Sequence, residues 1–142
     1  MKTITLTVPW CYLLGPAKRF ETRSWLTMHR GPIAIHAAKT IPDWVYQVCV
    51  QPEFFALLER LGLNPIDKLP RGAVIATADL VDIEPTSEEL RRRLSPQELL
   101  VGNFNDGRFA WDIRNVRRLP EPIPARGQLG LWTWEPPAGF KI

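Results

Sequence analysis

The chain has 142 residues, of which 45% are apolar and 23% are charged, and these values are typical of a globular protein. A chain of this length buries a sizeable core without disulfide or metal staples. The formal net charge is +3, which is mildly basic and compatible with a polyanionic partner. The composition therefore excludes a wholly disordered chain, and we expect a single domain over residues 1–142.

The two cysteines, Cys11 and Cys49, stand at no motif spacing, so they predict neither a zinc site nor a disulfide framework. Polar and apolar residues alternate over Met1–Val8, whereas a secretory signal peptide needs a continuous apolar run. No stretch approaches the roughly 20 apolar residues that cross a bilayer. We therefore expect a cytoplasmic protein with no membrane partner.

The first quarter of the chain is rich in strand signals. Residues 3–8 alternate threonine with apolar side chains, which predicts a half-buried strand. A short helical turn is expected over 10–14, and Gly15-Pro16 ends it. A second strand is expected over 18–25, and the continuous apolar character of 32–38 predicts a third strand buried on both faces.

The rest of the chain mixes helices with long strands. An interior proline breaks a helix, and Ser or Thr followed by carboxylates begins one. The expected elements are a helical region over 41–61 split at Pro52, a strand over 72–83, a helical region from 86 with a break at 95–96, a strand over 108–119, a proline-rich link over 120–124 and a strand over 130–135. Because strands dominate and connections are irregular, we predict an α+β fold: a small mixed, mainly antiparallel β-barrel flanked by short helices.

The strand expected over Lys18–Trp25 has an unusual charge pattern. Alternation places Arg19, Glu21, Arg23 and Trp25 on one face. A carboxylate between two guanidiniums, followed by a large ring, predicts the floor of a binding groove. The alternative is a solvated strand face, whose exposed ion pairs contribute only about 0–1 kcal/mol each. The other face carries Lys18, Phe20, Thr22 and Ser24.

Most familiar catalytic and cofactor motifs are absent from the sequence. It has no glycine-rich phosphate loop and no His-Glu-x-x-His or Cys-x-x-Cys set. His29 and His36 are the only imidazoles, and no serine lies in a nucleophile elbow. Cys11 lacks any local signal for activation and is expected to be a buried thiol. We therefore expect no metal and no cofactor.

Several separated segments together resemble the ASCH (activating signal cointegrator 1 homology) domain family of the PUA-like superfamily. They are Val8-Pro9-Trp10, 15–25, 31–39, 107–111 and 128–132. The family hallmark is Gly-x-Lys-x-x-Glu-x-Arg followed by Ser/Thr-Trp. In this chain the glycine lies one place earlier and a proline follows it, but the segments occur in the family's order over nearly the whole chain.

The resemblance implies a PUA-like β-barrel with a cleft between the barrel and its flanking helices. It implies recognition of RNA or of another nucleic acid or nucleotide. One enzymatic branch of the family hydrolyses acetylated cytidine with a Lys-x-x-Thr pair and a later glutamate. Lys18 matches that lysine, whereas Glu21 stands in place of the threonine nucleophile. The candidates for the later carboxylate are Glu88, Glu89 and Glu98.

Side-chain chemistry gives such a cleft a physical rationale. Cationic side chains hold phosphate, aromatic rings stack on unpaired bases, and a carboxylate accepts hydrogen bonds from a base or fixes a neighbouring arginine. The predicted ligand-binding set is Lys18, Glu21, Arg23, Trp25, His36, Lys39 and Trp111. The alternative is that Lys18 and Arg23 only form ion pairs with Glu21; they would then stabilise the fold and bind no ligand. Trp10, Trp132 and Trp134 are expected in the core.

Three functions remain open on sequence alone. The first is a nucleic-acid-binding or nucleotide-binding module. The alternative is a hydrolase of the amidohydrolase or nuclease type, acting on a modified nucleoside or RNA, in which Glu21 is a general base and Lys18 orients the substrate. The third is a protein-interaction domain whose groove residues only stabilise the fold. The run Arg91–Arg93 is interpreted as a solvated helix face.

Overall fold

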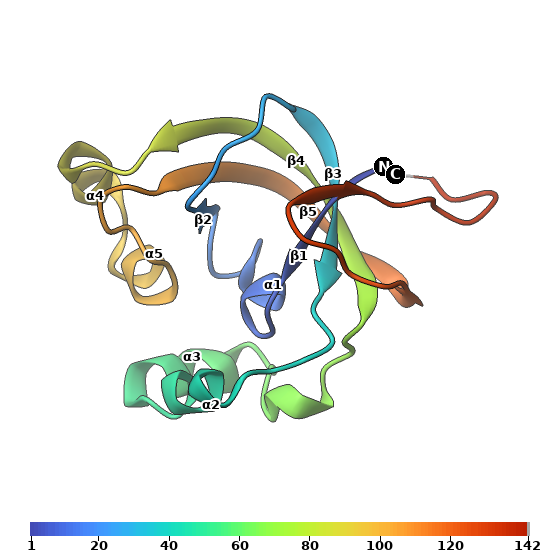
Figure 1. The fold of residues 1–142 in the computed structure, drawn as a ribbon. Helices are drawn as coiled ribbons and strands as arrows, with labels where there is room; N and C mark the ends of the chain where they lie inside the picture. The colour runs from blue at the N-terminus through green and yellow to red at the C-terminus, as the bar shows by residue number, and fades with distance from the viewer. Residues whose placement is uncertain (142) are drawn as a thin grey trace.

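A six-stranded sheet curls into a half-barrel and carries the rest of the chain (Figure 1). The structure is a computed structural model and describes residues 1–141. The strands are β1 (Lys2–Leu6), β2 (Phe20–Arg23), β3 (Gly31–Ala37), β4 (Ala73–Pro85), β5 (Phe109–Pro124) and β6 (Leu131–Thr133). The helices are α1 (Trp10–Leu13), α2 (Asp43–Cys49), α3 (Pro52–Arg60), the 3-10 turn η1 (Ile66–Lys68), α4 (Glu88–Arg93) and α5 (Pro96–Val101).

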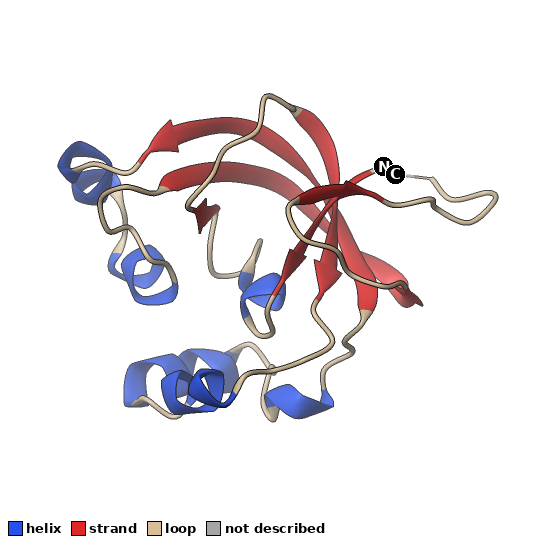
Figure 2. Cartoon of the chain, in the orientation of Figure 1, coloured by secondary structure: helices blue, strands red, loops and turns tan. Residues whose placement is uncertain are grey.

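The sheet has the strand order β2-β5-β4-β3-β1-β6, in which only β1 and β3 run parallel. The prediction of a mixed, mainly antiparallel α+β fold is therefore confirmed. The long β4–β5 pair carries three irregularities in its register, and such bulges increase the bend and twist of a sheet. The long strands consequently arch over the interior of the molecule (Figure 2).

The helices begin and end at the signals that the sequence carries. Ser87 and Ser95 precede α4 and α5, and their side chains accept hydrogen bonds from the backbone N–H groups of Leu90 and Glu98. Pro52 stands in the first turn of α3, where a missing N–H costs nothing. In Figure 1, α1 lies within the curve of the sheet, α2 and α3 lie below it, and α4 and α5 lie at one end.

The main core fills the concave side of the sheet. Trp111 and Ile35 are fully buried there, together with Leu13 from α1 and Leu58 from α3. Two smaller clusters flank the main core: Phe20, Leu90, Phe104 and Ala110 join β2 to α4, and Ala34, Val74, Trp132 and Trp134 cover the other face near β6. The expected burial of Trp132 and Trp134 is confirmed, whereas Trp10 is only partly buried and packs against the main core.

The predicted link over residues 120–124 is wrong, because these residues continue β5. Only Phe109–Asp112 of β5 pair with β2, so beyond this point β5 has a free edge on that side. Proline is tolerated on such an edge because its missing N–H interrupts no ladder. The sequence pattern of alternating prolines therefore marks an edge segment rather than the end of a strand.

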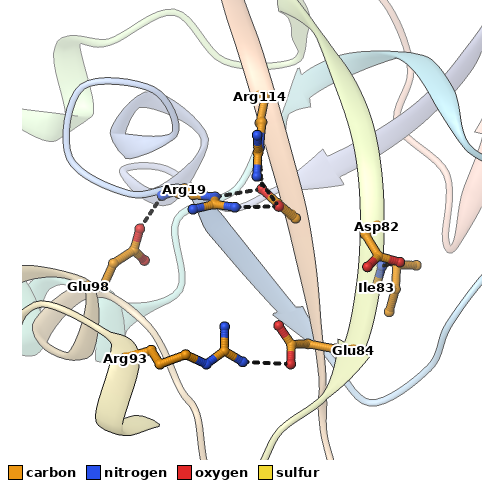
Figure 3. A network of polar contacts seen from close by, with 8 residues as sticks. Arg19, Asp82, Ile83, Glu84, Arg93, Glu98 and Arg114 are labelled. Carbon is orange, nitrogen blue, oxygen red and sulfur yellow. Dashed lines mark hydrogen bonds and ion pairs between the residues drawn. The ribbon is translucent and has the colours of Figure 1, made fainter. Parts of the chain in front are cut away.

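The edge strand β2 is anchored to β5 by a charged network beside it (Figure 3). The guanidinium of Arg19 donates two hydrogen bonds to Asp112, from Nε at 2.8 Å and from Nη2 at 2.7 Å. Arg114 contacts the same carboxylate at 3.0 Å. Burial alone would raise the pKa of Asp112, but the hydrogen bonds from Arg19 and Arg114 outweigh it and hold that pKa below its ordinary value.

We expect Asp112→Asn to destabilise the protein at neutral pH and to be nearly silent in acid. A carboxyl whose pKa is lowered by folding stabilises the native state above its unfolded-state pKa of about 3.9, and this contribution disappears as the pH falls through the folded-state pKa. Urea unfolding at pH 7 and below pH 3 measures the difference. If the free energies of unfolding of wild type and variant differed by the same amount at both pH values, the ion pairs of Asp112 would not be the source of the stability.

Candidate functional site

Lys18 and Glu21 form a buried ion pair at the entrance to β2. Lys18 Nζ lies 2.7 Å from Glu21 Oε1, and the two side chains are only 2% and 11% exposed. The prediction that they occupy opposite strand faces is wrong, because β2 begins at Phe20 and Lys18 lies in the preceding turn. That turn is closed by backbone hydrogen bonds from Lys18 to Leu13 and from Gly15 to Lys18.

Arg23 approaches the same carboxylate from the end of β2. Its Nε lies 3.6 Å from Glu21 Oε2, and its Nη2 donates to the carbonyl of Thr5 in β1 at 2.8 Å. Because β1 and β2 lie far apart in the strand order, this hydrogen bond spans the open side of the half-barrel. Arg19 does not join the group, since it binds Asp112. The predicted carboxylate between two guanidiniums is therefore a carboxylate between a lysine and an arginine.

A cleft of about 470 Å³ opens above this charged group, and we call it the front cleft. Its floor comes from the turn before β2 and from β2 itself, its walls from α1, α2 and α3, and its far side from the end of α5. The charged residues that line it are Lys18, Glu21, Arg23 and Arg108. The front cleft thus lies between the sheet and the helices, where the family resemblance implies a cleft.

Arg108 adds a cation that sequence reasoning missed. Its guanidinium donates to the hydroxyl of Thr22 at 3.3 Å and to the Thr22 carbonyl at 3.0 Å. Among the described residues, no carboxylate lies within ion-pair distance of it. The cleft therefore holds positive charge that the described part of the protein does not neutralise.

One wall of the front cleft is aromatic. The Trp10 ring lies 5.7 Å from that of Trp44 and 5.9 Å from that of Phe54, measured between centroids. Trp44 is 58% exposed, which is unusual for so large an apolar side chain. Its helical spacing suggests a core residue, but the buried stripe of α2 consists of Val45 and Cys49, one position further along. The sequence does not distinguish the two positions, because Trp44 and Val48 have the same helical spacing as Val45 and Cys49.

The two predicted stacking residues, Trp25 and Trp111, do not serve the front cleft. Trp111 is fully buried, so its ring is not available to a base, and this part of the prediction is corrected. Trp25 packs edge-on against it at 4.9 Å, and its carbonyl accepts a hydrogen bond from the Trp111 indole. Neither is among the described residues that line the front cleft. Trp111 belongs to the main core because its side chain lies on the concave side of the sheet.

His36 and Lys39 lie at a different place from Lys18, Glu21 and Arg23. They line a second pocket, of about 930 Å³, at the end of β3, which we call the rear pocket. The prediction that all seven candidate residues share one cleft is therefore wrong. This prediction is wrong because β3 and β2 are not neighbours: β4 and β5 lie between them in the sheet. In addition, a bulge precedes His36 at the end of β3.

The described residues offer little for catalysis at the front cleft. The two oxygens of Glu21 already face Lys18 and Arg23. Glu88 is exposed and pairs with Arg92. Glu98 accepts a hydrogen bond from the backbone of Arg19 outside the front cleft, and burial raises its pKa. No group of three or more metal-binding side chains occurs among residues 1–141.

Two other features of the sequence take structural roles. The run Arg91–Arg93 lies on α4, and its members pair with Asp106, Glu88 and Glu84 respectively. This agrees with the solvated helix face that the sequence indicates. Cys11 is buried as expected, and burial raises the pKa of its thiol, which disfavours the reactive thiolate.

None of the described helices is long and apolar enough to cross a membrane.

The fold is an α+β half-barrel with a cleft between its curled mixed sheet and its helices. The sequence is 26% identical to human activating signal cointegrator 1 over 125 residues, which is 87% of this chain and 20% of that protein. The mouse protein of the same name is 25% identical over 130 residues, covering 91% of this chain and 21% of the relative.

The chain is therefore similar to the cointegrator from which the ASCH domain family takes its name. The match covers most of the chain, but the chain spans only about a fifth of the length of these relatives. A comparison with protein-family models finds no match.

Proposed function

We propose that the front cleft binds an unpaired base of single-stranded RNA, with the flanking phosphates held by arginine. The observation that carries the proposal is the exposed ring of Trp44 beside Trp10, at the wall of a cleft whose floor holds the Lys18–Glu21–Arg23 group. Single-stranded RNA is commonly bound by stacking splayed bases on aromatic side chains. The resemblance to the ASCH family, which implies recognition of RNA or another nucleic acid, supports the same class of ligand.

The charges of the cleft suit a nucleotide. Arg23 and Arg108 present guanidinium groups that match phosphate geometry, and the Nε of Arg23 has no hydrogen-bond acceptor among the described residues. Glu21 is fixed by Lys18 and Arg23, so its position is set before a ligand arrives. A carboxylate held in this way accepts hydrogen bonds from the amino group of a base. The cleft volume of about 470 Å³ lies within the usual range for small-ligand sites.

The same geometry gives the hydrolase alternative less support. The related amidohydrolases use a threonine nucleophile, and in this chain Glu21 stands at that position. Glu21 forms ion pairs with Lys18 at 2.7 Å and with Arg23 at 3.6 Å. We therefore propose binding rather than turnover as the function of the cleft.

The proposal is tested by fluorescence anisotropy with a labelled single-stranded RNA at several salt concentrations. We expect salt-dependent binding, because phosphate contacts release counterions. Arg108→Gln should weaken binding and reduce the slope of log affinity against log salt by about 0.7, the value for one phosphate of a single strand. Arg92→Gln is the matched control, since that guanidinium is exposed and paired on α4. No binding at low salt, or equal slopes for wild type and Arg108→Gln, would sink the proposal.

A further inference from the structure

The rear pocket lies where the ends of three neighbouring strands, β3, β4 and β5, come together. The backbone N–H of Gly72 donates to Ala37 at 2.8 Å, and that of Ala125 donates to Gly72 at 3.1 Å. These hydrogen bonds hold the end of β3, the start of β4 and the end of β5 side by side. The pocket therefore has a rigid frame made of backbone rather than of side chains.

Each of the three segments supplies one cation to the rear pocket: Lys39, Arg71 and Arg126. Arg71 donates to the backbone carbonyl of Lys39 at 3.0 Å, which ties two of the segments together. No carboxylate lines the pocket, and none of the three cations forms an ion pair with a described residue. Three like charges gathered without a counter-charge favour an anionic ligand.

His36 also lines the rear pocket, and one nitrogen of its ring is a hydrogen-bond acceptor because the contacts of the ring define its tautomer. Its Nε2 lies 2.7 Å from the carbonyl oxygen of Ala125, and because a carbonyl only accepts, Nε2 carries the hydrogen. Trp132 packs edge-on against the ring at 5.6 Å and fixes its orientation. Nδ1 of the neutral ring therefore holds a lone pair. It is buried and has no partner among the described residues.

Gly127 controls the space next to this nitrogen. A Cβ at residue 127 would lie 2.8 Å from Cε1 and 3.1 Å from Nδ1 of His36, and 3.2 Å from the hydroxyl of Thr5. Only glycine fits here without a shift of the ring or the loop, because real Cβ atoms do not approach other atoms so closely. The residue that covers Nδ1 is thus the one that carries no side chain.

We propose that the rear pocket binds a ribonucleotide, as a site separate from the front cleft. Lys39, Arg71 and Arg126 hold its phosphate. Gly127 moves away from His36 when the ligand enters, and the exposed Nδ1 then accepts a hydrogen bond from a ribose hydroxyl. The partner of this acceptor is a group other than the phosphate, because a fully ionised phosphate has no hydrogen to donate, whereas ribose hydroxyls have. A buried acceptor left without a donor costs about 1–3 kcal/mol, so a ligand that supplies one is favoured. The phosphate can belong to a free ribonucleotide or to the phosphorylated end of an RNA strand.

Calorimetric titration with adenosine 5′-monophosphate and with its 2′,3′-dideoxy analogue tests the proposal. We expect wild type to prefer the ribonucleotide by about 2- to 10-fold, the effect of one hydrogen bond. His36→Gln should remove this preference, because the glutamine amide can still donate to Ala125 but offers nothing at the position of Nδ1. Arg126→Gln should weaken both ligands, and Arg92→Gln should weaken neither. Absence of binding to wild type, equal affinities for the two ligands, or an unchanged affinity in Arg126→Gln would overturn it.

Two further experiments distinguish a free nucleotide from the end of an RNA strand, and binding at the rear pocket from binding at the front cleft. Short RNA with and without a 5′-phosphate is titrated into Trp44→Ala, whose rear pocket is intact. A phosphate-dependent affinity for RNA above that for the free nucleotide identifies a strand end; otherwise the ligand is the free nucleotide. Nucleotide binding that persists in Trp44→Ala supports a separate rear site whether or not the front cleft binds RNA. Nucleotide binding lost in Trp44→Ala contradicts it.

Discussion

Replacing Glu21 with alanine is expected to destabilise the protein by about 3–5 kcal/mol, the usual cost of removing one partner of a buried ion pair. The side chain of Lys18 is 2% exposed, so its ammonium would remain buried without a counter-charge, and Arg23 would lose its neighbour as well. Urea unfolding followed by circular dichroism measures the loss. Glu88→Ala is the matched control, because Glu88 and Arg92 are both 73% exposed and such pairs contribute only about 0–1 kcal/mol.

A second variant separates the ion pair from its surroundings. Lys18→Met combined with Glu21→Leu replaces both charges with apolar groups of similar volume, a change that is often neutral or stabilising. We expect this double variant to recover most of the stability lost in Glu21→Ala but to bind RNA less well, since the polar floor is gone. A loss below about 1 kcal/mol for Glu21→Ala would contradict the buried pair as the anchor of the turn before β2.

Replacing Trp44 with alanine is expected to lower the affinity for single-stranded RNA by about 5- to 150-fold, which corresponds to the 1–3 kcal/mol of one stacked base. The ring is 58% exposed, so its removal should leave the free energy of unfolding nearly unchanged. Anisotropy with the labelled RNA measures the affinity, and thermal unfolding checks the fold.

Phe55 is the control for Trp44. It lies on the neighbouring helix α3 and is 44% exposed, but it does not line the front cleft. Phe55→Ala should therefore bind RNA as wild type does. If Phe55→Ala and Trp44→Ala lost affinity equally, the aromatic wall would not be the stacking platform, and an apolar surface on α2 and α3 would explain the effect instead.

The sequence predicted the fold well because its local signals agree with one another. Capping serines at 87 and 95 and the split at Pro52 mark the helices that the structure contains. The buried run over 32–38 became β3 in the centre of the sheet. The prediction at 120–124 is wrong because proline ends strand pairing only where its N–H is needed, and a strand with one free edge tolerates it.

The site was harder to predict, because its composition depends on contacts between distant segments. Alternation assigned Lys18 to the wrong side, since it assumed a strand where the chain makes a turn. His36 and Glu21 come from strands at separate places in the order β2-β5-β4-β3-β1-β6, which nothing local reveals. Trp44 and Arg108 were missed for the same reason: their roles depend on neighbours in α1 and β2.

The chain has six tryptophans, and their indole N–H signals in NMR spectra test the central claim most directly. During titration with single-stranded RNA, the signals of Trp44 and Trp10 should shift first, because their rings form the wall of the front cleft. The signals of the buried Trp111 and Trp134 should stay in place. Saturable RNA binding that leaves Trp44 and Trp10 unperturbed would contradict the assignment of the front cleft as the RNA site.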